Sequence, residues 1–219
     1  MPKSSQNILQ KVYQILYRSF GPQYWWPGET QIEIIVGAIL TQNTNWKNVE
    51  KAIENLKRHK VLTALSLRRI PVQELALLIK PAGYFNVKAS RLKSFVDFLF
   101  SEYSGNLKKM GQEKCPVLRE KLLEVKGIGP ETADSILLYA FNKPVFVVDA
   151  YTKRFLLRHQ WIDGSFDYRR VQELFMSQLS PEIKMFNEYH ALIVRLGKNY
   201  CKTSPACEQC PLKDLGALL

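Results

Sequence analysis

Apolar residues recur at intervals of three and four along most of the chain, with polar residues between them. In residues 8–20 this spacing puts the apolar side chains on one face of a helical repeat. Strand-like alternation is not sustained anywhere, so the pattern predicts an all-α protein of about ten helices. The segments with helical spacing are residues 8–20, 32–40, 49–56, 72–79, 89–100, 117–125, 132–141, 151–158, 168–179 and 187–196.

Glycine and proline fall mostly between these segments, at residues 21–22, 26–28, 81–83, 127–130 and 143–144. None of these breaks opens into a long linker, and the chain contains no internal repeat. The breaks therefore predict two helical layers that share one interface, rather than separate domains on flexible tethers.

Composition narrows the class of protein. Of the 219 residues, 46% are hydrophobic and 11% are aromatic, which is enough for a core and excludes a chain that is disordered throughout. No apolar run approaches the roughly 18 residues that cross a bilayer, so we expect no membrane span. Residues 1–6 lack the apolar segment of a secretory signal, and we expect a cytoplasmic protein.

The charge balance is strongly basic, with 31 Lys and Arg residues against 20 Asp and Glu and a formal net charge of +11. Such an excess favours a polyanionic partner, because each cation that neutralises a phosphate releases condensed counterions. The alternative is a protein that is merely basic, since net charge says nothing about fold.

Residues 122–138 form two helical segments joined by a tight turn. Gly127 and Gly129 are suited to positive φ and to close approach of another backbone, and Pro130 suits the first turn of a helix. The free N–H groups at such a helix start can bind a phosphate. An ordinary helix–helix turn is the alternative, but the basic charge favours phosphate binding.

An apolar run at residues 145–148 leads to Asp149 at the start of the next helical segment. Aspartate is common at a helix N-cap for structural reasons alone. The same placement would let a fixed carboxylate stabilise a sugar cation or activate a water molecule. The residues by themselves leave both interpretations open.

Aromatic residues gather near the second helical segment. Trp25 and Trp26 precede Pro27 and Gly28, and Trp46 follows a polar loop. A large ring in a loop needs a partner face, and these rings could simply fill the gap between two domains. The functional alternative is a stacking pocket for a base extruded from duplex DNA.

Four cysteines are too few for a disulfide scaffold in a chain of this length. Cys115 stands alone, whereas Cys201, Cys207 and Cys210 fall within ten residues. In a cytosolic protein this clustering indicates metal binding before disulfide formation. The histidines share no metal-ligand spacing, and we interpret all three as structural or surface residues: His59, His159 and His190.

In combination, these motifs resemble the helix-hairpin-helix DNA glycosylases of the endonuclease III type. The first set of matching segments is residues 127–129, 132–133, 147–149 and the C-terminal cysteines. A second set is most similar to the 3-methyladenine DNA glycosylase III branch: residues 25–27, 40–44 and 81–89. The resemblance covers nearly the whole chain.

The resemblance implies a two-lobed, all-α fold with DNA held at the junction of the lobes. A six-helix domain would span residues 28–141. Residues 1–27 and 142–219 would form the second domain, which contains the cysteine loop at 201–216. We expect a monomer that binds duplex DNA containing damaged bases, in the cytoplasm and associated with the nucleoid.

The resemblance also implies roles for single residues. Asp149 would be the catalytic aspartate, and Gln42 would insert into the base stack. The base pocket would be lined by Trp25, Trp26, Pro27 and Trp46. The DNA backbone would be contacted by Lys126, Gly127, Gly129, Glu131 and Thr132. The duplex path would be lined by Lys88, Arg91, Lys93, Lys126, Lys153 and Arg154.

One departure from the family bears on the reaction. Bifunctional members carry a Schiff-base lysine just after the hairpin, and Glu131 occupies the matching position here. A carboxylate cannot form an imine with the sugar, so we expect a monofunctional glycosylase that releases alkylated purines such as 3-methyladenine. The alternatives are a glycosylase with lyase activity for oxidised or mismatched bases, and a non-catalytic protein that binds DNA structures.

The cysteine loop is similar to the family's iron–sulfur loop, whose four thiolates hold a [4Fe–4S] cluster. Here Gly216 occupies the position of the fourth cysteine. Three alternatives stay open for Cys201, Cys207 and Cys210. They hold a cluster with a non-cysteine fourth ligand, they hold zinc with a ligand from elsewhere, or they belong to a decayed loop held by packing.

Overall fold

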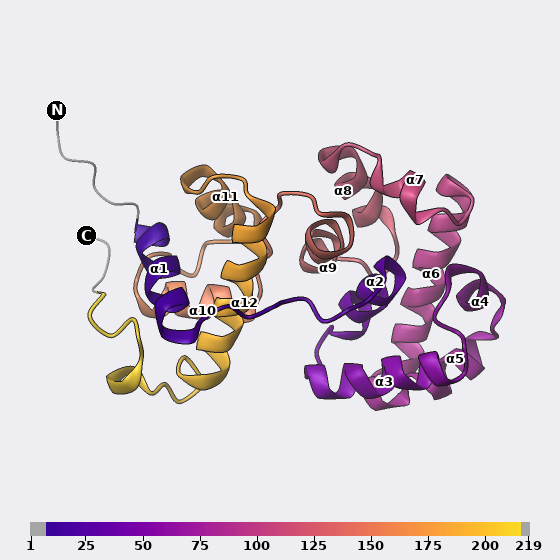
Figure 1. Ribbon diagram of the computed structural model, residues 1–219, viewed down its shortest axis with the longest axis horizontal. Helices are drawn as coiled ribbons and strands as arrows, with labels where there is room; N and C mark the ends of the chain where they lie inside the picture. Colours follow the sequence, from indigo (N-terminus) through magenta and orange to yellow (C-terminus); the bar gives the residue numbers. More distant parts are fainter. Residues whose placement is uncertain (1–7, 216–219) are drawn as a thin grey trace. The chain divides into compact units, whose positions relative to one another are not determined.

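The computed structural model describes residues 8–215, and every regular element within that range is a helix (Figure 1). The prediction of an all-α protein is therefore confirmed. The chain divides into two compact units. We call Trp26–Lys143 the central unit, and Met1–Trp25 together with Pro144–Leu219 the terminal unit. No described helix is long and apolar enough to cross a membrane.

The central unit is built around α2, whose residues are buried at eight of ten positions. Helix α2 packs against α3, α6 and α9, and Figure 1 shows it between α6 and α9. The helices of this unit are α2 (Gln31–Leu40), α3 (Trp46–Arg58), α4 (Ala64–Arg69), α5 (Val72–Leu78), α6 (Phe85–Tyr103), α7 (Leu107–Gly111), α8 (Cys115–Glu124) and α9 (Pro130–Ser135), with a 3₁₀ turn, η1 (Lys80–Ala82).

Short polar side chains start several of these helices. Thr30, Asn45, Thr63 and Asn106 each accept a hydrogen bond from a backbone N–H in the first turn that follows. Such bonds satisfy donors that have no partner inside the helix. Local sequence thus sets where these helices begin.

The last helix of the central unit differs from the prediction. An α-helix was expected over residues 132–141, but beyond Ser135 the chain forms a π-helical segment, η2 (Ile136–Ala140). The Ser135 hydroxyl donates to the Glu131 carbonyl at 2.7 Å, and this local bond competes with the α-helical ladder. All five residues of η2 are buried, so tertiary packing holds the wider turn.

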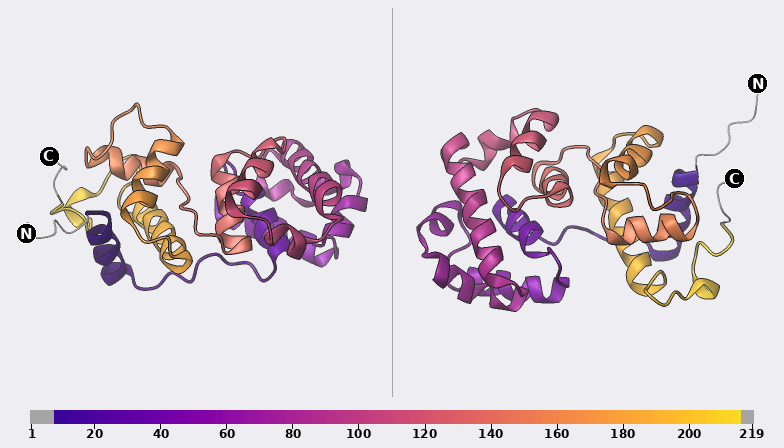
Figure 2. Two further views of the ribbon diagram at one scale, coloured as in Figure 1. Left: turned by 90° about the horizontal axis from the view of Figure 1, so that it is seen from above. Right: turned by 180° about the vertical axis from the view of Figure 1, so that it is seen from behind.

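The terminal unit joins the two ends of the chain. Helix α12 packs against α1 and α10, and both views of Figure 2 show α1 beside α12. Phe146 stacks on Phe175 with ring centroids 4.0 Å apart, and the buried Tyr189 hydroxyl donates to the Leu9 carbonyl at 2.8 Å. The helices of this unit are α1 (Ile8–Phe20), α10 (Ala150–Arg158), α11 (Tyr168–Gln178) and α12 (Ile183–Asn199), with a 3₁₀ turn, η3 (Cys207–Gln209).

Candidate functional site

The turn between α8 and α9 is the hairpin that the sequence predicts, with one correction. Gly127 has φ of +90°, as expected for a residue that only glycine fits easily. A Cβ on Gly127 would also collide with the side chain of Arg91. Gly129 does not have positive φ: it is the N-cap of α9, with an extended backbone at φ of −95°. Ile128 is buried between the two glycines.

Gln42 ties the end of α2 to this turn. Its side-chain amide donates to the Gly127 carbonyl at 3.0 Å and to the Thr132 hydroxyl at 2.9 Å. Its carbonyl oxygen accepts from the Arg91 guanidinium. Gln42 is thus placed beside the hairpin, and its insertion into a base stack stays a prediction.

An ion pair between a partly exposed arginine and a buried aspartate joins the two helices of the hairpin. Arg119 on α8 donates to both carboxylate oxygens of Asp134 on α9, at 2.7 and 3.0 Å. The Asp134 side chain is fully buried. A two-bonded pair of this kind sets both the spacing and the orientation of the helices. Sequence reasoning missed it, although an aspartate inside an apolar helical segment was a usable signal.

The other residues expected to contact the DNA backbone differ in exposure. Lys126 in the turn and Glu131 in the first turn of α9 are exposed. Thr132 is buried, and its hydroxyl accepts the hydrogen bond from Gln42. Lys126 and Glu131 are accordingly the members of this set whose side chains face solvent, while Thr132 helps to hold the turn.

An aromatic cluster lies on α2. The ring of Trp26 meets Trp46 edge-on, with centroids 5.0 Å apart, and it lies at 4.8 Å and a 32° tilt from Tyr139 of η2. A Cβ at Gly37 would touch both tryptophan rings at 3.4 Å, so glycine lets them lie directly on the helix. Both tryptophans are only half-buried. Sequence reasoning missed Tyr139, because nothing local shows that η2 turns it toward the tryptophans.

The remaining pocket candidates lie at the unit boundary. Trp25 is half-buried and is the last residue of the terminal unit's first segment, whereas Pro27 is exposed and belongs to the central unit. Glu33, buried on α2, accepts from the Glu29 backbone N–H at 3.3 Å and pairs with Lys57 at 2.8 Å. Its hydrogen bond raises the pKa of the Lys57 ammonium. These contacts anchor the loop that follows Trp26.

Asp149 is the N-cap of α10 in the terminal unit, which confirms the structural interpretation, and its catalytic role stays a prediction. Its Oδ1 accepts from the backbone N–H of Thr152 at 2.7 Å and from the Thr152 hydroxyl at 2.9 Å. Its Oδ2 lies 3.4 Å from Nε2 of His190 on α12. The Asp149 side chain is 11% exposed and is therefore nearly buried.

These contacts decide the charge of Asp149. Burial by itself would raise the pKa of the carboxyl, because a low dielectric disfavours the charged form. The hydrogen bond and electrostatic interaction with His190, together with the two bonds from Thr152, outweigh burial and hold the pKa of Asp149 below its usual range. Asp149 is therefore a carboxylate at neutral pH.

Two lysines expected along the duplex path have their ammonium groups bonded to backbone carbonyls of the central unit instead. The Lys88 ammonium is buried and donates to the carbonyls of Leu40 and Ala82 at 2.9 and 2.8 Å. Burial and the nearby charge of Arg91 lower the pKa of Lys88 to about 8. The expectation that Lys88 lines the duplex path is wrong, because its ammonium group donates to carbonyls at the end of α2 and in η1 and is not exposed to a phosphate.

Lys93 is the second of these corrections. Its ammonium donates to the carbonyls of Leu67 and Arg68 at 2.8 and 2.9 Å, and also to that of Ile70, so it caps the end of α4.

Arg154, also expected along the duplex path, is bonded to the backbone of the terminal unit. Its guanidinium donates to the Cys201 carbonyl at 2.6 Å and to the Gly197 carbonyl. Such bonds satisfy carbonyls that have no partner inside a helix.

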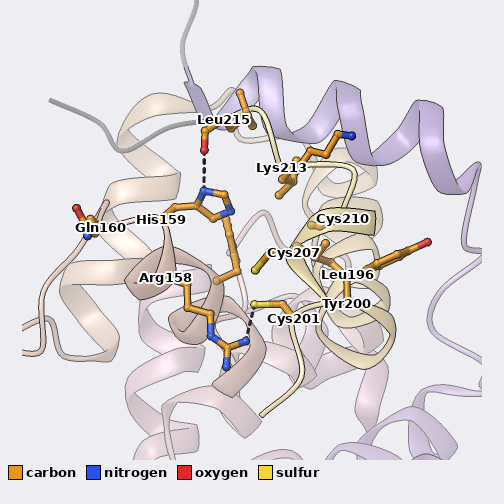
Figure 3. Close-up of a pocket in the computed structure, with 12 residues that line it drawn as sticks. Arg158, His159, Gln160, Leu196, Tyr200, Cys201, Cys207, Cys210, Lys213 and Leu215 are labelled. Atoms are coloured by element: carbon orange, nitrogen blue, oxygen red, sulfur yellow. Dashed lines mark hydrogen bonds between the residues drawn. The ribbon is translucent and has the colours of Figure 1, made fainter. Parts of the chain in front are cut away.

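The three C-terminal cysteines line one cavity of about 310 Å³ within the terminal unit (Figure 3). Its wall also includes Arg158 and His159 at the end of α10. Arg158 donates to the Cys201 sulfur at 3.2 Å. Within residues 8–215 no three His, Cys, Asp or Glu side chains converge closely enough to hold one metal ion. Gly216 lies outside the described residues, and Cys115 begins α8 in the central unit.

The structure thus divides the candidate residues into three groups. Gln42, Gly127 and Thr132 are joined by hydrogen bonds in the central unit, which also contains the aromatic cluster. Asp149 belongs to the terminal unit and is joined there to His190. The cysteines form a third group, with their own cavity in that unit.

Comparison with known proteins identifies relatives over nearly the full length. The model of the HhH-GPD superfamily base excision DNA repair protein matches residues 36–181. A protein of Methanocaldococcus jannaschii, provisionally described as a DNA repair glycosylase, is 44% identical over 216 residues, which cover 98% of each chain. Endonuclease III of Thermotoga maritima is 29% identical over 182 residues, covering 83% of this chain and 80% of that protein.

Solved structures extend the comparison. The H. pylori 3-methyladenine DNA glycosylase bound to 1,N6-ethenoadenine has a TM-score of 0.73 and 29% identity, and the match covers 87% of this chain and 95% of that one. An endonuclease III–DNA complex has a TM-score of 0.80 at 21% identity, covering 94% and 92% of the two chains. The second likeness concerns the fold alone.

Proposed function

The chain belongs to the HhH-GPD superfamily of base excision DNA repair proteins, and on that premise we propose that it is a monofunctional DNA glycosylase for alkylated purines such as 3-methyladenine. It is a base excision repair glycosylase by family. Beyond the family, the proposal specifies which class of base is removed and that the DNA strand is not cleaved. The first point rests on the aromatic cluster and the second on Glu131.

The aromatic cluster of Trp26, Trp46 and Tyr139 is the observation that carries the class of base. A 3-methylated adenine carries positive charge, and an electron-rich ring face attracts a cation by roughly 0.5–2 kcal/mol. A neutral oxidised base gains no such attraction. The half-buried rings of Trp26 and Trp46, which both pack against Gly37 of α2, therefore favour binding of a cationic purine over a neutral base. The likeness to a 3-methyladenine DNA glycosylase supports the same class.

Asp149 supplies the charge that the reaction needs. As the bond from the sugar C1′ to the base breaks, its electron pair goes to the base and neutralises the methylated ring, while positive charge develops on the sugar. An ionised carboxylate stabilises that charge, and a water oxygen then bonds to C1′ and gives its proton to the carboxylate. Because the base is already cationic, no acid has to protonate it.

Glu131 bears on strand cleavage. It is exposed in the first turn of α9 and occupies the position where bifunctional members carry the Schiff-base lysine. A carboxylate has no amine with which to form an imine, so the abasic site would be left uncut.

The first experiment measures release of damaged bases by the wild type and by Asp149→Asn under single-turnover conditions. We expect release of 3-methyladenine by the wild type and a loss of roughly 100-fold or more in the variant. Asparagine is also a good N-cap, so α10 should stay intact.

The matched control for this variant is Asp167→Asn. Asp167 caps α11 of the same unit, and its side chain accepts from the Arg170 N–H at 2.8 Å. The control should keep full activity. Equal turnover by Asp149→Asn and the wild type would instead favour a non-catalytic DNA-binding protein.

A second experiment offers the enzyme abasic DNA, with borohydride as a trap for an imine. The proposal expects neither a nick nor a covalent adduct. Release of oxidised pyrimidines together with a trapped adduct would favour the alternative, an endonuclease III-like glycosylase with lyase activity, toward which the identity to Thermotoga maritima endonuclease III points.

A further inference from the structure

The cavity behind α10 carries donors that the glycosylase reaction does not use. Cys201, Cys207 and Cys210 line it together with His159, which the sequence alone presents as a structural residue. Figure 3 shows the sulfur atoms of Cys201 and Cys207 pointing toward the side where Arg158 and His159 lie. The cavity therefore brings three thiols and one imidazole to a common space.

The hydrogen bond of His159 fixes which of its nitrogens is free to bind a metal. Nδ1 lies 3.0 Å from the Leu215 carbonyl oxygen. A carbonyl only accepts, so Nδ1 carries the proton, and in the neutral ring Nε2 has the lone pair. Metal-binding histidines commonly donate their other N–H to a backbone carbonyl in this way. In Figure 3 the second ring nitrogen faces the space next to the cysteines.

The hydrogen bond to Leu215 places His159 next to the part of the chain where relatives carry their fourth cysteine ligand. Leu215 is the residue directly before Gly216, the position that matches the fourth cysteine of the family. The imidazole is thus bonded to the chain one residue before the place from which a fourth thiolate would come. Phe155 and Trp161 pack on the imidazole, at centroid distances of 6.4 and 4.9 Å, and hold its orientation.

The residues around the cavity fit a cluster of several metal atoms. The donors stand around a cavity of about 310 Å³, and in an iron–sulfur cluster each donor binds a different iron. Thiolates bring negative charge, and Arg158 and Lys213 line the same wall. The contact of 3.2 Å from Arg158 to the Cys201 sulfur places a cation beside one donor.

From this geometry we propose that His159 Nε2 is the fourth ligand of a [4Fe–4S] cluster held by Cys201, Cys207 and Cys210. The bonds from such a cluster to these four side chains would connect the loop at 201–210 to the end of α10. The assignment is independent of which base the enzyme removes.

The test compares iron, acid-labile sulfide, visible absorbance and electron paramagnetic resonance of anaerobically purified wild type, His159→Ala and His159→Cys. We expect iron and sulfide in the wild type. In His159→Ala the iron-to-sulfide ratio should fall by about a quarter, with the resonance of a three-iron cluster, or the cluster should be lost. His159→Cys should retain wild-type iron and sulfide.

His59→Ala is the matched control, because His59 of the central unit also has Nδ1 next to a backbone carbonyl, that of Asn55, at 2.8 Å. It should leave the metal content unchanged. The proposal fails if His159→Ala keeps wild-type iron, sulfide and resonance, or if the wild type binds zinc or no metal. It also fails if His159→Cys loses the cluster as fully as His159→Ala, because the imidazole would then act through packing.

Discussion

At the scale of single residues, Asp149 shows how a nearly buried carboxylate is kept charged. Burial opposes its ionisation, and the contacts from His190 and Thr152 outweigh burial. A carboxyl whose folded pKa is depressed adds stability above its unfolded pKa of about 3.9. That stability is lost as the pH falls through the lower folded value. The charged form of Asp149 should therefore persist at any pH well above 4.

His190 is then expected to set the acid limb of the pH–rate profile. In His190→Ala the largest contribution that lowers the pKa of Asp149 is removed while burial remains, so the acid limb should move to higher pH. Single-turnover base release, measured as a function of pH, checks this expectation. His59→Ala provides the control, and an unshifted acid limb in His190→Ala would show that His190 does not tune Asp149.

At the scale of elements, the hairpin depends on one glycine and not on both. Gly127 adopts φ of +90° against Arg91, whereas a Cβ on Gly129 would meet nothing within 4 Å. Gly127→Ala should destabilise the protein by roughly 1–2 kcal/mol from backbone conformation alone. It should also displace Arg91 from Gln42 and weaken DNA binding.

The matched variant is Gly129→Ala, which has room for a methyl group and a negative φ. Chemical denaturation and binding to undamaged duplex DNA, measured for both variants, should separate them. Equal effects of the two substitutions would contradict the role given to Gly127.

The pairing of α8 with α9 is the second element-scale feature that can be tested. Removing Arg119 would leave the fully buried Asp134 without its bidentate partner, and breaking a buried pair in this way costs roughly 3–5 kcal/mol. We expect Arg119→Ala to lower the free energy of unfolding by about that amount, as measured by chemical denaturation.

The control is Arg169→Ala, which removes an exposed pair with Glu173 on α11. An exposed pair at this spacing contributes roughly 0.3–0.5 kcal/mol, so the loss should be small. A loss in Arg119→Ala as small as that in the control would mean that Asp134 is satisfied without Arg119.

At the scale of the whole molecule, the net charge of +11 is a poor guide to the DNA-binding surface. The ammonium groups of Lys88 and Lys93 are bound by backbone carbonyls of the central unit, whereas Lys126 is exposed in the hairpin turn. Only a cation free to approach a phosphate releases counterions on binding. Charge count and charge available to DNA are therefore different quantities in this protein.

The salt dependence of binding to undamaged duplex DNA measures that difference. Lys126→Ala should reduce the slope of log K against log salt by about 1. Lys93→Met should leave the slope unchanged, because the Lys93 ammonium caps α4. An unchanged slope in Lys126→Ala would exclude this side chain from the phosphate contacts.

The sequence by itself determined what depends on neighbouring residues. Apolar spacing predicts an all-α protein, which the structure confirms, and the hairpin, the N-cap of α10 and the family all follow from short motifs. Glu131 likewise needs only its place after the hairpin. These features are local, because helix periodicity and caps are set within a few positions of the chain.

Only the tertiary structure decided which side chains meet across the sequence. Gln42 bonds to Gly127, 85 positions away, and Asp149 meets His190 on another helix. Neither the internal use of Lys88 nor the place of His159 beside the cysteines has a local signal. Periodicity shows which face of a helix is buried, but the partner of a buried polar group is chosen by packing, since its hydrogen bonds must be satisfied wherever the fold places it.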